Sequence, residues 1–107
     1  MSPEEIAKEI VKVSDKVTTY IPVHKDGKFR PIIINTSLKY DITDVEPPKD
    51  DYFKYYKLSK AEIFDVITAA EGIPRTEVEI LVGKFLVDNN LVNSDVLYLI
   101  PHNSSVS

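Results

Sequence analysis

Two helical patterns separated by a single glycine, Gly72, constrain the fold of this chain more than any other feature of its sequence. Apolar residues from Ile63 to Ala70 recur every three or four positions, which places them on one face of a helix. Glycine readily adopts the left-handed conformation that ends a helix, so the first helix should stop at Gly72. The second pattern begins at Thr76 and ends just before Asn90, which can take the same left-handed conformation. The sequence therefore predicts two helices joined by a tight turn.

Capping signatures support these helix starts and add a helix at the N-terminus. The signature is a serine or threonine followed three residues later by a glutamate, so that each side chain bonds the other residue's backbone N–H. It occurs at Ser2–Glu5, Ser59–Glu62 and Thr76–Glu79. We therefore expect a first helix that ends near Ser14.

Residues 17–34 carry the clearest strand signal. Two β-rich runs flank Asp26 and Gly27, a pair favoured at the centre of a two-residue hairpin turn, where both residues need a positive φ. This register places Pro22 opposite Pro31 at a non-hydrogen-bonded pair, where neither can donate to a third strand. The sequence predicts a two-stranded β-ribbon that is free at both edges.

Residues 35–51 form the least ordered-looking stretch, because five carboxylates and a Pro-Pro pair fall within it. We predict an acidic loop here, with a short strand from Leu38 by apolar alternation as the alternative. A closing strand is expected over Asp95–Ile100, ended by Pro101, followed by a frayed tail at residues 102–107.

These elements predict an α+β fold with an N-terminal helix, a two-stranded β-ribbon, a helix pair and a closing strand. A chain of 107 residues is long enough for a single domain, residues 1–107. It contains no cysteine, which excludes a disulfide framework or a thiolate metal site. Because it also lacks an apolar run of about 20 residues and a basic signal sequence, we expect no membrane contact and a cytoplasmic location, or a nuclear one in a eukaryote.

The residues around the turn glycine read Ile-Thr-Ala-Ala-Glu-Gly-Ile-Pro-Arg-Thr-Glu-Val over positions 67–78, and a long helical pattern and a strand follow. This arrangement, over residues 59–100, resembles a winged helix-turn-helix domain. The resemblance implies a winged-helix-like fold, in which the helix from Thr76 is the recognition helix and lies in the major groove of DNA.

The outward face of this second helix favours a protein partner instead. If Val78 points inward, the core face also contains Leu81, Val82, Phe85 and Leu86, and the opposite face contains Thr76, Ile80, Gly83 and Val87. Glu77 and Glu79 flank that opposite face and would repel phosphate, whereas a DNA-reading face carries basic and amide side chains. The second apolar stripe is either buried within the domain or an exposed protein interface.

No catalytic constellation stands out. His24 and His102 have no partner at metal-ligand spacing. The three glycines Gly27, Gly72 and Gly83 are isolated, so they cannot form a phosphate-cradling loop. The sequence predicts a protein that is not an enzyme and has no cofactor, metal or small-molecule ligand.

The sequence has one basic spot, the hairpin tip with Lys25, Lys28 and Arg30. It is either an ordinary solvated turn or an arm that contacts nucleic-acid phosphates or an acidic protein. The net charge of −4 disfavours nucleic acid as the main partner.

The sequence thus favours a non-enzymatic regulatory or adaptor protein that acts by protein–protein contact, as a subunit or inhibitor of a larger complex; small acidic proteins of this kind are common among viral proteins. Its partner would be another protein or a second copy of the chain. The alternative is a winged-helix-like DNA-binding transcriptional regulator. Expected partner-binding residues are Ile80, Gly83, Val87, Lys25, Lys28 and Arg30, and the alternative uses Lys25, Lys28, Arg30, Arg75 and Lys84 on nucleic acid.

Overall fold

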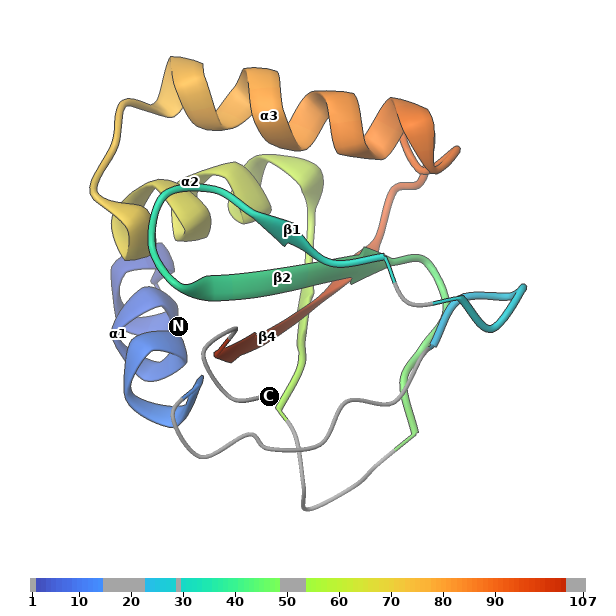
Figure 1. The fold of residues 1–107 in the computed structure, drawn as a ribbon, viewed down its shortest axis with the longest axis horizontal. Helices are drawn as coiled ribbons and strands as arrows, with labels where there is room; N and C mark the ends of the chain where they lie inside the picture. The colour runs from blue at the N-terminus through green and yellow to red at the C-terminus, as the bar shows by residue number, and fades with distance from the viewer. Residues whose placement is uncertain (1, 15–22, 29, 49–53, 104–107) are drawn as a thin grey trace.

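The computed structural model describes residues 2–14, 23–28, 30–48 and 54–103 (Figure 1). Within these residues the chain forms three helices and a four-stranded antiparallel sheet, which confirms the predicted α+β class. None of these helices is long and apolar enough to cross a membrane. The elements in chain order are α1 (Pro3–Ser14), β1 (Ile32–Ile33), β2 (Leu38–Thr43), β3 (Tyr56–Leu58), α2 (Lys60–Glu71), α3 (Arg75–Asp88) and β4 (Leu97–Asn103).

The sheet has the strand order β1-β2-β4-β3, so the last strand of the chain lies in its interior. Tyr40 of β2 faces Ile32 of β1 on one side and Pro101 of β4 on the other. Leu99 of β4 faces both Ile42 of β2 and Tyr56 of β3. The strand β4, which follows α3 in the chain, therefore pairs with strands that lie far away in the sequence.

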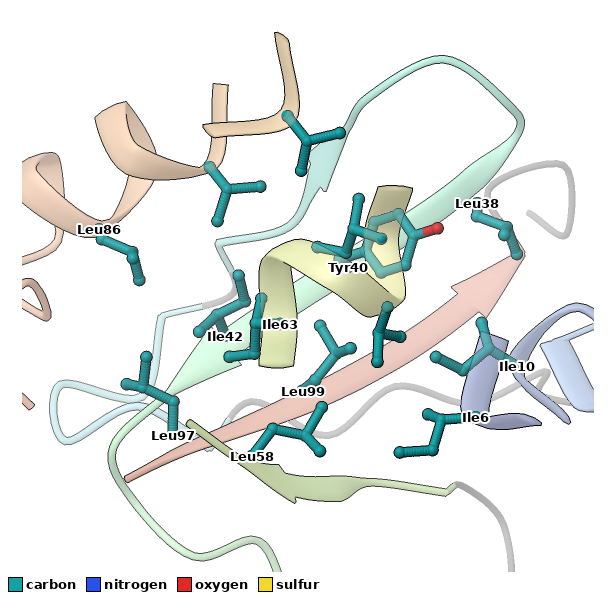
Figure 2. Packing of buried hydrophobic residues seen from close by; sticks show 14 of the residues in the cluster. Ile6, Ile10, Leu38, Tyr40, Ile42, Leu58, Ile63, Leu86, Leu97 and Leu99 are labelled. Atoms are coloured by element: carbon teal, nitrogen blue, oxygen red, sulfur yellow. The ribbon is translucent and has the colours of Figure 1, made fainter. Parts of the chain in front are cut away.

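The core lies between the helices and the sheet, as Figure 2 shows. α2 packs against both α1 and α3, and Figure 1 shows α3 along the upper edge of the molecule with α2 beneath it. Full burial of each aliphatic side chain here stabilises the fold by roughly 1.5–3 kcal/mol. The fully buried side chains include Ile10, Tyr40, Ile42, Ile63, Val66, Ile67, Val78, Val82, Leu86, Leu97 and Leu99.

The helix ends follow the local chemistry with one exception. The reciprocal capping box of Ser59 and Glu62 is present, Ser2 accepts from the Glu5 amide at 3.2 Å, and Gly72 ends α2 with a φ of +69°. The expected capping box of Thr76 is wrong, because α3 begins one residue before it, at Arg75, directly after a proline whose side chain cannot cap.

The second helix of the pair ends as expected. Asn90 has a positive φ of 61°, and the Leu91 amide donates to the Leu86 carbonyl at 2.7 Å. Leu91 is buried and belongs to the core cluster. This closure turns the chain from the end of α3 toward β4.

The predicted two-stranded ribbon is wrong within the described residues. The Gly27 amide donates to the His24 carbonyl at 2.8 Å, so the turn centres on Lys25 and Asp26 and Gly27 follows it with a φ of +69°. This is the geometry of a type I turn followed by a left-handed glycine, rather than the predicted turn with Asp26 and Gly27 at its centre. Further along, Ile32 pairs with Tyr40 in the sheet, because this pairing lets it pack against the core. The Pro22 pairing lies outside the described residues.

The acidic loop and the frayed tail are also corrected. β2 occupies Leu38–Thr43, inside the expected loop of residues 35–51, because its alternate apolar side chains fill the core. β4 continues through Pro101 to Asn103, into the expected tail of residues 102–107. Among the described residues, β4 pairs beyond Leu99 with β2 alone, and a strand accepts a proline on a side without a hydrogen-bonded neighbour. Residues 49–51 and 104–107 lie outside the described part.

Candidate functional site

The outer face of α3 carries the candidate interaction surface. Ile80 and Val87 are 71% and 63% exposed, although they lie on a helix whose opposite side is fully buried. They are seven residues apart, or about two helical turns, and therefore share one side. We call the residues Thr76, Ile80, Gly83 and Val87 the α3 stripe. The interpretation in which this stripe is buried within the domain is wrong for this chain.

The inner face of α3 matches the expected core face with one correction. Val78, Val82 and Leu86 are fully buried, and Phe85 packs against the core at partial burial. Leu81, expected in the core, is 39% exposed, because it lies about 100° around the helix axis from Val82, at the margin of the core face. It lies about 100° from Ile80 as well, with Glu77, Lys84 and Asp88 between the two, so it does not extend the α3 stripe.

Gly83 lies at the middle of the α3 stripe, and nothing within the chain requires a glycine there. A Cβ built at this position meets no atom within 4 Å. A glycine inside a helix costs about 1 kcal/mol relative to alanine. Gly83 therefore leaves a shallow gap between Ile80 and Val87 at the expense of helix stability.

Acidic side chains dominate the borders of the α3 stripe. Arg75 forms ion pairs with Asp65 at 3.4 Å and with Glu79 at 3.2 Å. On the next turns, Lys84 Nζ lies 2.8 Å from Asp88, and this hydrogen bond raises the pKa of Lys84.

Glu77 is exposed and forms no ion pair with any residue that the structure describes. Both cations at these borders, Arg75 and Lys84, are therefore already paired, and the borders keep an excess of negative charge.

The expected basic spot is paired with carboxylates for the most part. Arg30 binds Asp26, and Lys25 Nζ lies 3.9 Å from Asp44. Lys28 is exposed. The turn that carries these residues and the C-terminal end of α3 share a hollow of about 210 Å³. The structure thus brings Lys25 and Arg30 near the residues that follow the C-terminal end of α3. The hollow is lined by His24, Lys25, Asp26, Arg30, Asp44, Asn89, Asn90 and Leu91.

His24, which lines this hollow, forms a buried pair with Asp41 that the sequence did not reveal. His24 Nε2 is 2.6 Å from Asp41 Oδ1, and the two side chains are 3% and 0% exposed. An ionised carboxylate only accepts, so Nε2 carries the proton and donates. Arg30 Nη1 faces the other ring nitrogen at 3.5 Å. Both edges of the imidazole are engaged, and the pair fastens the turn to β2.

A second buried carboxylate, Glu71, fastens the connection between β1 and β2. It accepts from the backbone amides of Asn35 at 3.0 Å and Thr36 at 3.2 Å, and from the Thr36 hydroxyl. Burial and then the negative charge of Glu71 raise the pKa of Tyr40. Burial and the hydrogen bond to Glu9 raise the pKa of Tyr56. Among the described residues, no three histidine, cysteine or carboxylate side chains are grouped to hold a metal ion.

No protein-family model matches this chain, and no curated protein and no solved structure is significantly similar to it. The resemblance to winged helix-turn-helix domains therefore stays a prediction.

Proposed function

We propose that this chain is a non-enzymatic regulatory or adaptor protein of the cytoplasm that contacts a protein partner through the α3 stripe. The observation that carries the proposal is the exposure of Ile80 and Val87 on a helix that is already anchored by its other side. Burying such side chains against a partner stabilises a complex, since apolar surface leaves water. An exposed apolar stripe bordered by polar residues is typical of a protein interface.

The pairing of the basic residues gives less support to nucleic acid as the partner. Lys25, Arg30, Arg75 and Lys84 each have a carboxylate within 4 Å. A phosphate would have to displace these carboxylates, and Glu77 would repel it. A protein partner needs no such rearrangement.

Site-specific photo-cross-linking tests the proposal in the native host. A photoreactive amino acid at position 87 is expected to form a discrete covalent adduct with another protein. The matched control places the same residue at position 33, because Ile33 is an exposed apolar side chain on β1, away from α3. Equal adducts from both positions, or adducts to nucleic acid alone, would overturn the proposal.

A further inference from the structure

We propose that the partner element is a short cationic amphipathic helix, which inserts a large apolar side chain over Gly83 in the α3 stripe. The inference rests on the proposed function and adds the chemistry of the partner. It combines three observations on α3: the shape of the stripe, its area and the charge of its borders.

The shape is that of a hole for one side chain of a second helix. In helix–helix packing a side chain inserts between four residues of the facing helix, at positions i, i+3, i+4 and i+7. Ile80, Gly83, Lys84 and Val87 have this spacing. Gly83 supplies the floor of the hole, because its Cβ position is open. The stem of Lys84 forms one wall, while its ammonium is held by Asp88 at 2.8 Å.

The area of the stripe fits one helix rather than a globular face. Its large exposed apolar side chains are Ile80 and Val87. A stable interface between two globular proteins buries about 800 Å² per partner, far more than two side chains supply. An amphipathic helix that lies along α3 matches a stripe that is two turns long.

The charge of the borders selects a cationic partner. Glu77, Glu79 and Asp88 flank the hole on both sides; Glu79 pairs with Arg75 and Asp88 with Lys84, whereas Glu77 has no ion pair within the described residues. A lysine or arginine on the edge of the partner helix would lie against Glu77, and such complementarity also speeds association. The chain as a whole carries a net charge of −4, which has the same effect at longer range.

A second copy of this chain fits the same surface less well. An antiparallel two-fold pair that matches Ile80 with Val87 has its axis beside Gly83. Equivalent flanks then face each other, so Lys84 meets Lys84 of the second copy, and Glu77 meets Asp88 of the second copy. These like charges would oppose the pairing.

Selection from a peptide library tests the partner chemistry directly. The probe is a phage-displayed library of 18-residue helical peptides, with one face varied among alanine, leucine and phenylalanine and the flanks varied among lysine, glutamine and glutamate. The full-length protein is expected to enrich peptides with lysine flanks and a leucine or phenylalanine at the centre of the apolar face. No enrichment, or enrichment of neutral or acidic flanks, would overturn the inference.

A substitution that fills the hole gives the second readout. Gly83→Leu is expected to weaken binding of the selected lysine-flanked peptide at least tenfold in a fluorescence-anisotropy titration. The thermal midpoint should stay the same or rise, because leucine favours the helix and a Cβ at this position meets no atom within 4 Å. Ile33→Glu, at an exposed apolar site on β1, is the control and should leave binding unchanged. Unchanged binding to Gly83→Leu contradicts the inference.

The two proposals fail separately. If cross-linking from position 87 captures a protein but the peptide experiments fail, the protein-contact function stands and the cationic helix is wrong. If sedimentation shows a dimer that Gly83→Leu dissociates, the occupant is a second copy, which also overturns the inference. If cross-linking and peptide selection both fail, both proposals are wrong.

Discussion

Replacing Asp41 with alanine is expected to destabilise the protein by about 3–5 kcal/mol, because it breaks a buried hydrogen bond to a carboxylate and leaves the donor without its acceptor. The separate interactions of Asp41 in the structure add up to a similar loss of unfolding free energy. The 2.6 Å hydrogen bond between Asp41 and His24 joins two nearly inaccessible side chains, and a bond to a charged group contributes about 1.5–3 kcal/mol. Its loss leaves the His24 N–H buried without that acceptor, which costs about 1–3 kcal/mol more.

Urea unfolding followed by circular dichroism measures this effect. With a slope of about 1–3 kcal/mol per molar urea, the Asp41→Ala midpoint should fall by roughly 1–5 M. Asp44→Ala is the matched control: it removes the same charge three residues away, where the partner Lys25 is exposed and 3.9 Å distant. It should cost less than about 0.5 kcal/mol. A loss below about 1 kcal/mol for Asp41→Ala, or equal losses for the two variants, would refute the buried pair.

Three further predictions concern α3, the helix turn and a buried tyrosine. Leu86→Ala should cost about 2–5 kcal/mol in urea unfolding because it opens a cavity, whereas Val87→Ala, at the next and exposed position, should change stability by less than about 0.5 kcal/mol. Gly72→Ala should lower the thermal midpoint because its φ is +69°, with a cost of about 1 kcal/mol or more, whereas Gly83→Ala should raise stability by about 1 kcal/mol. The folded pKa of Tyr40 is raised above its unfolded value of about 10. The stability that Tyr40 contributes is therefore complete below pH 10 and is lost as pH rises above it, by about 1.4 kcal/mol per pH unit. Tyr40→Phe should flatten this alkaline decline of the unfolding free energy in a pH series of urea titrations.

The helix ends were predictable from sequence because their chemistry is local. The capping box of Ser59 involves residues three apart, and Gly72 and Asn90 provide the left-handed conformation by themselves. Thr76 failed as a cap because the preceding proline had already started the helix. Two signals competed within three residues, and the covalent restriction of proline φ prevailed.

The strand β2 and the buried pair could not be predicted with the same rules. A carboxylate such as Asp41 indicates a solvated loop until its partner is known, and His24 is 17 residues away. The alternation from Leu38 was visible, yet one neighbour of β2 in the sheet, β4, comes from the far end of the described residues. The turn was predicted one residue too late, on Asp26 and Gly27 instead of Lys25 and Asp26, because Gly27 fits both turn types.

The candidate site also combines features that the sequence predicts with features that depend on the whole fold. The 100° rotation per residue sufficed to place Ile80 and Val87 opposite Val78. Their exposure depended on whether another element covers α3, which periodicity does not encode. The pairing of Arg30 with Asp26 is local, whereas the approach of Lys25 and Arg30 to the end of α3 depends on the fold of the whole chain.

The composition of α3 is poorly suited to stability alone, and this supports a role for its outer face. Val78, Val82 and Leu86 anchor the helix, at roughly 1.5–3 kcal/mol for each buried side chain. On the outer face, Ile80 and Val87 have lower helix propensity than alanine or lysine, and together with the glycine between them they lower helix stability by about 2 kcal/mol. The burial on the inner face exceeds this loss, so the helix forms regardless. A surface that departs from the best helix formers at three positions on one side, with no compensating contact from the residues that the structure describes, is typical of a binding site.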